Sequence, residues 1–424
     1  VLAQLVVHIR RGPDVHGLGQ DILQSPGVGA IGMHANGKVV HDAGIHASSQ
    51  RLRLRGRELL VEHPLTLLVE RHTLRETLGL GLDASALGMP DAFGPQQAGG
   101  AVFLGTRTPA RAQGRVPPAC VVSDDCWALV DDPQIDVVLE LMGDVPLGRA
   151  LVLRALSNGK HIVTANKALL ALHGEEIMRL ADQTGRHVLF EGAVAVSIPI
   201  IKTLRESAAA NRISSIVGIL NGTSNYILSQ MSEHGVDFAS ALADAQDKGF
   251  AEANPALDVN GGDAAHKLTL LAALAFGVPI NLTAVEVQGI DGMDPLDMAF
   301  ARRLGHEIKL IAQARLASNR LLVRVQPTLV PRHSMLAQVR GAMNGIVLQG
   351  DLMGSAFLYG SGAGGRQTSS AVLADLLELA NRPMSGARTG PHNMGFWPRS
   401  AAAPAVDIGA DYVCAYYIRV RLDD

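Results

Sequence analysis

Residues 249–267 read G-F-A-E-A-N-P-A-L-D-V-N-G-G-D-A-A-H-K, and the rest of the chain is organised around them. Pro255 and the glycines of Asn260-Gly-Gly262 predict a loop, because both residue types favour turn conformations. Asp263 follows this loop and opens an apolar run that continues through Phe276 and predicts a helix. Asp263 and Lys267 are four residues apart, so their side chains lie on one face of that helix near its N-terminus.

The Asp263–Lys267 pair has two interpretations. A surface ion pair would contribute roughly a few tenths of a kcal/mol. A lysine that is partly desolvated beside a carboxylate is instead a proton-transfer group, and the apolar helix behind it favours this interpretation. Glu252 and Asp258 lie within the same sixteen residues, 252–267, and could reach the same pocket.

The whole pattern G-F-A-E-x-N-P-x-x-D-V-N-G-x-D-A-x-x-K resembles the signature of the homoserine dehydrogenase family. Other segments resemble the same family, and the match runs from about Val121 to about Pro383. These segments are Val163-Thr-Ala-Asn-Lys167, Glu191-Gly-Ala-Val-Ala195, Ile198-Pro-Ile-Ile-Lys-Thr-Leu204 and Ile219-Leu-Asn-Gly-Thr-Ser-Asn-Tyr-Ile227.

The resemblance implies the reversible, NADP- or NAD-dependent oxidation of L-homoserine to L-aspartate 4-semialdehyde, in threonine, methionine and isoleucine biosynthesis. The cofactor carries out the hydride transfer, and the protein positions the alcohol and manages one proton. We expect Lys267 to exchange that proton, with Lys167 assisting and Asp263 orienting the lysine or the hydroxyl. We expect the substrate to be bound by Glu252 and Asp258, which would hold its ammonium group, and by Gly222 and Thr223, which would contact its backbone.

Composition describes a soluble globular protein of two or three domains. The chain has 424 residues, of which 47% are hydrophobic and 18% charged, and its net charge of -3 indicates no polyanionic partner such as nucleic acid. Cys120, Cys126 and Cys414 are too few and too scattered for a disulfide framework, which favours a reducing, cytoplasmic location. None of them sits where a thiolate would be activated, so a thiol-dependent semialdehyde dehydrogenase is disfavoured. No apolar run is long enough to span a membrane, and no signal sequence is recognisable.

Residues 135–164 predict a strand, helix and strand in the order of a parallel α/β sheet. The apolar run 135–142 is typical of a buried parallel strand, 146–157 of a helix, and 161–164 of the next strand. Ligands bind at the carboxyl ends of such strands. We therefore expect a Rossmann-like nucleotide-binding domain with an α+β substrate domain, and cofactor contacts from Gly143, Thr164, Asn166 and Lys167. The alternative for Lys167 is a solvated lysine at a helix start.

Two later segments could also bind ligands. After a strand at 187–190, the resemblance implies a sodium site formed by the backbone carbonyls of Glu191, Val194, Val196 and Ile198. Oxygen ligands suit such a cation, although an ordinary strand-to-helix turn would explain the segment equally well. Residues 360–368 are glycine-rich and precede a helix at 369–380, so Gly362, Gly364 and Thr368 are candidate cofactor contacts. The alternative there is a flexible turn with no ligand.

The remaining substrate-domain elements are predicted from apolar periodicity. Helices are expected at 199–210, 226–233, 238–248 and 295–304, and strands at 213–220, 284–289, 308–315 and 321–329. This order favours an antiparallel or mixed sheet covered by helices on one side. The resemblance implies a homodimer formed through this domain.

The N-terminal part of the chain departs from the family. A literal G-x-G-x-x-G at Gly27–Gly32 follows a proline and not a strand, which makes it weak evidence for a phosphate-binding turn. The histidines in this part have no metal-ligand spacing. The segment could be a divergent domain, a fused piece or a frameshifted stretch. The alternative function is therefore a catalytically impaired relative that binds substrate but no dinucleotide.

The predicted domain organisation follows from these observations. Residues 1–110 are unassigned, 111–190 and 359–383 form the nucleotide-binding domain, and 191–358 form the substrate and dimerisation domain. Residues 384–410 are rich in glycine, proline and alanine and are predicted to be a linker. Residues 411–424 resemble the opening strand of a truncated ACT-like regulatory domain, for which we expect no working effector site.

Overall fold

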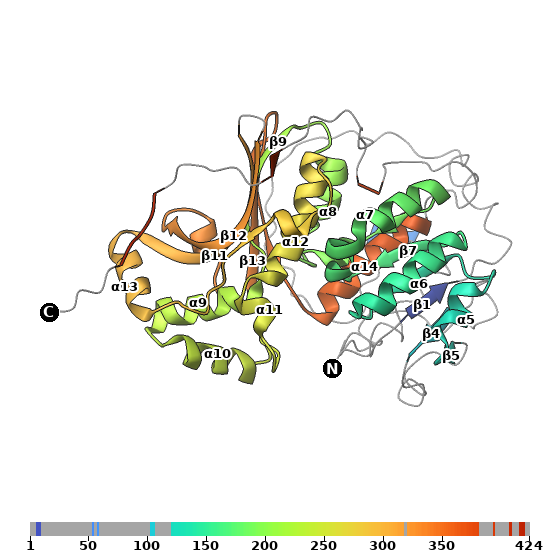
Figure 1. Ribbon diagram of the computed structural model, residues 1–424, viewed down its shortest axis with the longest axis horizontal. Coiled ribbons are helices and arrows are strands. Elements are labelled where there is room, and N and C mark those ends of the chain that lie inside the picture. The colour runs from blue at the N-terminus through green and yellow to red at the C-terminus, as the bar shows by residue number, and fades with distance from the viewer. Residues whose placement is uncertain are drawn as a thin grey trace.

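The structure is a computed structural model that describes residues 6–9, 53–54, 57–58, 102–106, 120–317, 320–380, 393–394, 407–408 and 415–419. The described elements form two units that lie side by side (Figure 1). The first unit contains a sheet of six described strands, and the second a sheet of seven. A separate two-stranded ribbon joins β2 (Arg53–Leu54) to β3 (Arg57–Glu58). The G-x-G-x-x-G segment at 27–32 lies outside the described residues.

The sheet of the first unit has the order β5-β4-β1-β6-β7-β8. In chain order this is 3-2-1-4-5-6, the order of a doubly wound nucleotide-binding sheet. β4–β5, β6–β7 and β7–β8 pair in parallel, whereas β1 is antiparallel to both of its neighbours. The strands are β1 (Val6–Ile9), β4 (Val102–Gly105), β5 (Val121–Ser123), β6 (Val137–Glu140), β7 (His161–Thr164) and β8 (Val188–Leu189).

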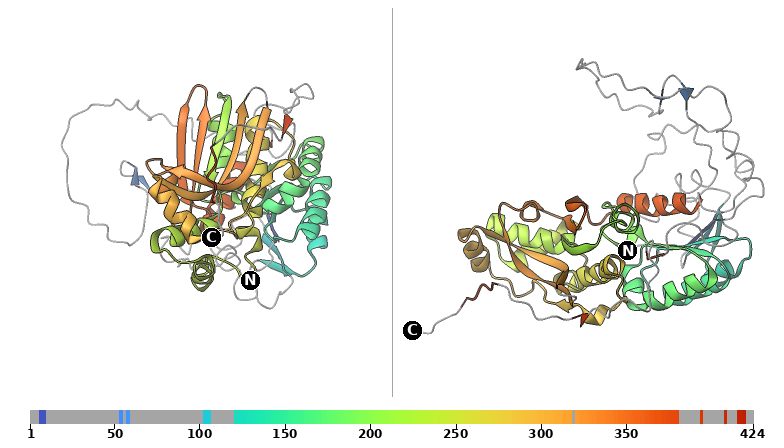
Figure 2. Two further views of the ribbon diagram at one scale, coloured as in Figure 1. Left: turned by 60° about the vertical axis from the view of Figure 1, so that its left-hand side comes forward. Right: turned by 90° about the horizontal axis from the view of Figure 1, so that it is seen from above.

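Helices cover both faces of this sheet. Figure 2 shows α14 on the side opposite α6 and α7. All residues of β6 and β7 are buried, which confirms the prediction of parallel strands with apolar neighbours on both faces. The helices are α5 (Cys126–Asp131), α6 (Val145–Ser157), α7 (Lys167–Thr184) and α14 (Gly365–Ala380).

The second unit has a mixed sheet with the order β10-β12-β11-β9-β13-β14, and β15 pairs with β12. β10 and β15 run parallel to β12, and the other pairs are antiparallel. The strands are β9 (Ile213–Ile219), β10 (Glu286–Val287), β11 (His306–Ala317), β12 (Arg320–Pro331), β13 (Met343–Gly350), β14 (Gly354–Ser361) and β15 (Asp407–Ile408).

One helix, α12 (Gly262–Phe276), joins the two units. It packs on β9, β11 and β12 of the second unit and on α7 of the first (Figure 1). Its apolar residues are buried all round because the helix has protein on several sides. The other helices of this unit are η3 (Glu191–Ala193), α8 (Ile200–Lys202), η4 (Thr203–Ser207), α9 (Gly222–His234), α10 (Phe238–Asp247), α11 (Ala256–Val259), η5 (Leu282–Ala284), α13 (Pro295–Arg303) and η6 (Leu336–Gln338).

Several predicted boundaries were wrong. The helix expected at 199–210 is a short α-helix followed by a π-helix, and the strand expected at 284–289 is only β10. α9 begins at Gly222 and not at Tyr226, because the Asn221 side chain accepts the Ser224 N–H and caps the helix.

The C-terminal segment also differs from its prediction. The strand expected at 411–424 is not formed at 415–419, the part that the structure describes. Tyr417 and Arg419 instead bind Asp297 of α13. Among the described residues, no helix is both long enough and apolar enough to cross a membrane.

Candidate active site

The Lys267 side chain lies in the second turn of α12 and points back toward the start of that helix. Its Nζ donates to Asp263 Oδ2 at 2.7 Å and to the carbonyl of Leu220 at 2.7 Å. Lys267 and Asp263 are each 7% exposed. The pair predicted from the i, i+4 spacing is therefore formed. Because the pair is buried, the surface ion-pair interpretation is wrong.

A second lysine reaches the same carboxylate from the first unit. Lys167 is the first residue of α7, and its Nζ lies 3.2 Å from Asp263 Oδ1. The Lys167 side chain is 39% exposed, so the cluster opens to solvent on this side. Asp263 thus joins Lys167 of one unit to Lys267 of the other.

The sharing of one carboxylate by two ammonium groups separates their proton affinities. Burial lowers the pKa of Lys267, and the nearby Lys167 ammonium adds to this effect while Asp263 opposes it. Asp263 raises the pKa of Lys167. Burial by itself raises the pKa of Asp263, but the two ammonium groups outweigh it and hold that pKa below its usual range. Asp263 therefore stays ionised, and Lys267 is the member of the cluster that gives up a proton more readily.

Asn221 connects this cluster to the rest of the 249–267 motif. Its Nδ2 donates to Asp258 Oδ1 at 2.7 Å and to Asp263 Oδ2 at 2.9 Å. The side chain is 4% exposed. Asn221 stands in the segment 219–227 that resembles the family, but sequence reasoning predicted neither its capping of α9 nor its contact with Asp263, although an asparagine directly before a helix is a typical N-cap.

The expected substrate-binding residues differ in their exposure and in their hydrogen bonds. Asp258 is half-buried, and burial raises its pKa, while the Asn221 amide opposes the rise. Glu252 is exposed. The Thr223 hydroxyl donates to the Phe250 carbonyl at 2.6 Å and so anchors the motif. A Cβ at Gly222 would lie 2.7 Å from the Ala342 carbonyl oxygen, which explains why glycine occupies this position.

The carboxyl ends of β6 and β7 meet at Glu140, which is 1% exposed. Its carboxylate accepts the Met142 N–H at 2.9 Å and the Thr164 hydroxyl at 2.8 Å. The Asn166 amide donates to it at 3.3 Å, and Asn166 Oδ1 caps α7. Burial raises the pKa of Glu140, although these hydrogen bonds oppose the rise. Sequence reasoning missed Glu140, for which an acid inside an apolar strand was the available signal.

The Thr164 and Asn166 side chains therefore hold the strand ends together and place Lys167 at the start of α7. Gly143, with φ of 74°, lies exposed after β6. In the glycine-rich segment, Gly362 is buried and Gly364 has φ of 125°. The Thr368 hydroxyl donates to the Gly364 carbonyl at 2.9 Å, within the first turn of α14. Gly143 thus follows the end of β6, whereas Gly362 and Gly364 precede α14.

Comparisons with known proteins agree with this architecture. The family model "Homoserine dehydrogenase" matches residues 199–377, and the model "Homoserine dehydrogenase, NAD binding domain" matches residues 102–191. The homoserine dehydrogenase of Neisseria gonorrhoeae is 44% identical over 310 residues, which cover 73% of this chain and 71% of that protein. That of Pseudomonas aeruginosa is 44% identical over 307 residues, 72% of this chain and 70% of that protein.

The chain belongs to the homoserine dehydrogenase family. A solved homoserine dehydrogenase from Thiobacillus denitrificans aligns with a TM-score of 0.67 at 43% identity, covering 72% of this chain and 70% of that one. The family is one of NAD(P)-dependent oxidoreductases, and the predicted Rossmann-like domain with a mixed-sheet catalytic domain is confirmed. The matched regions begin at residue 102, so the two models do not include β1.

The direction of β1 is the main departure from a homoserine dehydrogenase nucleotide-binding domain. In a doubly wound sheet the phosphate-binding turn follows the first strand at the carboxyl edge of the parallel strands. Because β1 is antiparallel to β6, Ile9 at the carboxyl end of β1 pairs with Val137 at the start of β6. The carboxyl end of β1 is therefore not at the edge that carries Gly143 and Lys167.

The segment expected to bind a cation forms a tight buried turn. Ala195 has φ of 53°, and among the described residues it is the only non-glycine with positive φ. The Glu191 carboxylate accepts the N–H groups of Ile201 and Lys202 at 3.0 and 2.8 Å and so is not directed at the turn. Burial raises the pKa of Glu191. Within the described part of the chain, no three His, Cys, Asp or Glu side chains are grouped as metal ligands.

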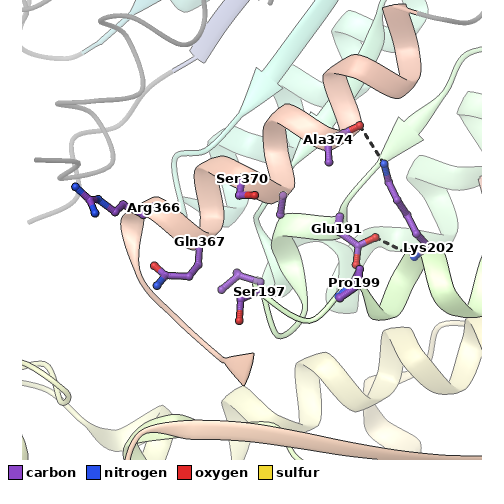
Figure 3. Close-up of a pocket in the computed structure, with 10 residues that line it drawn as sticks. Glu191, Ser197, Pro199, Lys202, Arg366, Gln367, Ser370 and Ala374 are labelled. Atoms are coloured by element: carbon purple, nitrogen blue, oxygen red, sulfur yellow. Dashed lines mark hydrogen bonds between the residues drawn. The ribbon is translucent and has the colours of Figure 1, made fainter. Parts of the chain in front are cut away.

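A cavity of about 360 Å³ lies between this turn and the first turns of α14 (Figure 3). Its wall includes Glu191, Lys202, Gln367 and Ser370. Lys202, the last residue of α8, donates to the Ala374 carbonyl at 3.0 Å and so links α8 to α14. Lys267 is not part of this wall, so the cavity and the lysine cluster are separate features of the ligand side.

Proposed function

We propose that this chain interconverts L-homoserine and L-aspartate 4-semialdehyde with NADP or NAD, and that Lys267 exchanges the proton of the substrate hydroxyl. The observation that carries this proposal is the Asp263 carboxylate shared between Lys267 and Lys167, at 2.7 and 3.2 Å, where the two units meet. A buried amine whose proton affinity is lowered is suited to general acid–base chemistry near neutral pH.

The residues of the cluster divide the work of one proton transfer. Asp263 and the Leu220 carbonyl take two hydrogens of the Lys267 ammonium group, which leaves the third direction for the substrate hydroxyl. When Lys267 is neutral, its lone pair accepts the hydroxyl proton, and Lys167 keeps the positive charge that stabilises Asp263. The exposed Glu252 and the half-buried Asp258 supply negative charge for the substrate ammonium.

The dinucleotide supplies the hydride acceptor when it is bound. The residues that would hold it are Gly143, at the end of β6, and Gly362 and Gly364 before α14. Main-chain N–H groups at a helix start suit the negative charge of a pyrophosphate. Lys167 would lie beside the nicotinamide, with Thr164 and Asn166 holding the backbone that positions it.

We further propose that the turn after η3 binds a monovalent cation such as sodium through the carbonyls of Glu191, Val194, Val196 and Ile198. The left-handed Ala195 supports this, because backbone strain is often found at ligand sites. Among the described residues, the Val194 and Val196 carbonyls accept no hydrogen bond, and Val194 is fully buried. The Ile198 carbonyl accepts the Ile200 N–H at 2.7 Å, so it would serve as a shared ligand. The test is to measure the thermal unfolding midpoint at increasing sodium chloride and at equal concentrations of choline chloride. A midpoint that rises with sodium but not with choline supports the site.

We also propose a homodimer formed through the sheet of the second unit. Val217, Val347 and Phe357 are register partners across β9, β13 and β14 and form a half-buried apolar row. Tyr359, 54% exposed, stacks beside Phe357 with ring centroids 6.4 Å apart. Sedimentation of the wild type and of Val347→Glu tests this face, because a charge in an apolar interface would leave the variant monomeric.

The catalytic proposal is tested by following homoserine-dependent formation of reduced nicotinamide. Lys267→Ala should lower turnover by about two to four orders of magnitude with the fold intact, the range typical of general acid–base groups. Normal turnover in a folded Lys267→Ala variant would refute the role of this lysine.

The second candidate is a homoserine dehydrogenase relative that binds substrate but holds dinucleotide poorly. The antiparallel pairing of β1 with β6 favours it, because the carboxyl end of β1 lies at the wrong edge for a pyrophosphate. Calorimetric titration of the full chain with NADH and with NADPH separates the two candidates. Micromolar binding supports the enzyme, and homoserine binding without dinucleotide binding supports the impaired relative.

A further inference from the structure

Asn344, in β13, contacts the same carbonyl group as the proposed proton-transfer lysine. Its Nδ2 donates to the Leu220 oxygen at 3.1 Å, and Lys267 Nζ donates to that oxygen at 2.7 Å. Leu220 directly follows β9, and Asn344 is fully buried. One carbonyl oxygen therefore holds both an amide from the sheet and the amine from α12.

The Asn344 amide group also lies against the glycine-rich segment. A Cβ built on Gly362 would lie 2.2 Å from Asn344 Nδ2 and 2.3 Å from Oδ1. Only a glycine leaves room for the amide in this position. Among the described residues, Asn344 Oδ1 has no hydrogen-bond partner. A buried acceptor without a donor is unusual in native proteins, so the position calls for a reason other than the stability of the core.

We propose that Asn344 is a positioning residue for the reaction: it fixes the Leu220 carbonyl, and through it the Lys267 amine, and Gly362 is a glycine in order to leave the amide in place. This inference rests on the proton-transfer role proposed for Lys267. It extends that role to a residue of the sheet, 124 positions from Leu220 along the chain.

The Asn344 amide acts on Lys267 in two ways. It holds the carbonyl in one direction, and a displacement of a reacting group by about 1 Å can cost about a hundredfold in rate. It also occupies one lone-pair direction of the carbonyl oxygen, so the Lys267 ammonium has a weaker acceptor beside it and releases its proton more easily.

Removal of the amide therefore has a direction that can be measured. In Asn344→Ala the Leu220 oxygen accepts from Lys267 alone, the ammonium form is favoured, and the pKa of Lys267 rises. The acid limb of the pH profile of kcat for homoserine oxidation then moves to higher pH. The ionisable groups that interact with Lys267 are Asp263, Lys167, Asp258 and His266, and none of them is replaced in this variant.

A matched control separates this effect from a general loosening of the core. Asn225, in α9, is 1% exposed and donates to the carbonyls of Val339 and Gly341 at 3.2 and 2.8 Å. It has no contact with Leu220 or Lys267 among its described hydrogen bonds. Asn225→Ala removes an equally buried amide and should leave the position of the pH profile unchanged.

Gly362→Ala provides a second perturbation, and kcat is measured for every variant at saturating dinucleotide because Gly362 is also a proposed dinucleotide contact. The added methyl group displaces the amide without removing a side chain from the core, so this variant also serves if Asn344→Ala does not fold. In the double variant Asn344→Ala/Gly362→Ala there is no amide for the methyl group to displace.

The experiment measures kcat and KM against pH for these variants. We expect each single variant to lose about tenfold to a hundredfold in kcat, with a smaller change in KM. We expect the acid limb of the kcat profile to move to higher pH by at least about half a unit in each single variant. We expect the kcat of the double variant to be no lower than that of Asn344→Ala.

Additive losses in the double variant would overturn the inference. So would an unshifted pH profile in both single variants, or an equal shift in Asn225→Ala. If Lys267→Ala is inactive in the same assay but the Asn344 and Gly362 variants do not give the expected results, only the inference about Asn344 is refuted. If Lys267→Ala is active, the proposed function is refuted as well.

Discussion

Asp263→Asn perturbs the centre of the proposed site without changing its shape. The amide keeps the size of the carboxylate but removes the charge that Lys267 and Lys167 share. Removing one partner from a buried pair typically costs about 3–5 kcal/mol, because the remaining charge is left without compensation. Lys267, only 7% exposed, can avoid this cost by losing its proton in the folded variant.

The cost of losing that proton can be worked out from the unfolded state. A lysine with an unfolded pKa of about 10.4 costs about 4.6 kcal/mol to neutralise at about pH 7, that is, about 3.4 units at about 1.36 kcal/mol each. The two estimates agree in size. Because the unfolded variant then binds one proton more than the folded variant, its stability rises by up to about 1.4 kcal/mol for each pH unit. In the wild type Asp263 opposes the loss of that proton, so the stability of the wild type rises less steeply with pH and the destabilisation by Asp263→Asn shrinks as the pH rises.

Urea unfolding of the wild type and of Asp263→Asn at about pH 7 and about pH 8 measures this effect. The control is Asp244→Asn, which breaks an ion pair with the same i, i+4 spacing at the surface, where Lys248 is 53% exposed. We expect a small, pH-independent change for the control. The reasoning is refuted if Asp263→Asn costs no more than Asp244→Asn, or if its cost is the same at both pH values.

Two further predictions concern the surroundings of the site. Burial raises the pKa of Asp375 to about 7 although the Lys202 ammonium lies 3.8 Å away. Between the unfolded pKa and about pH 7, the folded state therefore binds a proton that the unfolded state releases. The stability that this proton supplies is lost as the pH rises toward 7. Asp375→Asn should therefore stabilise the protein at about pH 8, by roughly 1–3 kcal/mol relative to its effect at about pH 5, and equal effects at both pH values in urea unfolding would contradict this. A Cβ at Gly289 would lie 2.4 Å from the Val259 carbonyl oxygen, whereas one at Gly292 would meet nothing within 4 Å. Gly289→Ala should cost about 1–3 kcal/mol or more and weaken homoserine binding, while Gly292→Ala should do neither, as thermal unfolding and calorimetry can check.

Local patterns in the sequence predicted the parts of the site that depend on short-range geometry. The i, i+4 spacing of Asp263 and Lys267 predicted their contact, and the strand, helix and strand at 135–164 predicted that Lys167 follows the carboxyl end of a parallel strand. Chain spacing alone did not predict that Lys167 would meet Asp263 across the two units. The family resemblance placed both residues in one site.

The polar groups that hold the site together were not predictable in the same way. Glu140, Asn221 and Asn344 bind partners between 24 and 124 residues away, so no periodic pattern reveals them. The sequence offers only the presence of a polar residue in an apolar strand or before a helix. The direction of β1 depends on its pairing with β4 and β6, which lie far along the chain. The π-helix at Thr203–Ser207 likewise has no local signal, and its residues were predicted as ordinary helix.

The central claim is that the Lys267 amine carries the reacting proton, and comparison of two buried lysines tests it most directly. Lys309 is 3% exposed, burial lowers its pKa to about 8, and its described hydrogen bonds go to Asn225 and the Val339 carbonyl and not to Asp263. Methionine keeps most of the length of either side chain and removes its amine. Turnover of homoserine is measured for Lys267→Met and Lys309→Met in protein shown to be folded. We expect kcat to fall by about a hundredfold to ten-thousandfold in Lys267→Met and to stay within a fewfold of wild type in Lys309→Met. Equal turnover in the two folded variants would contradict the account.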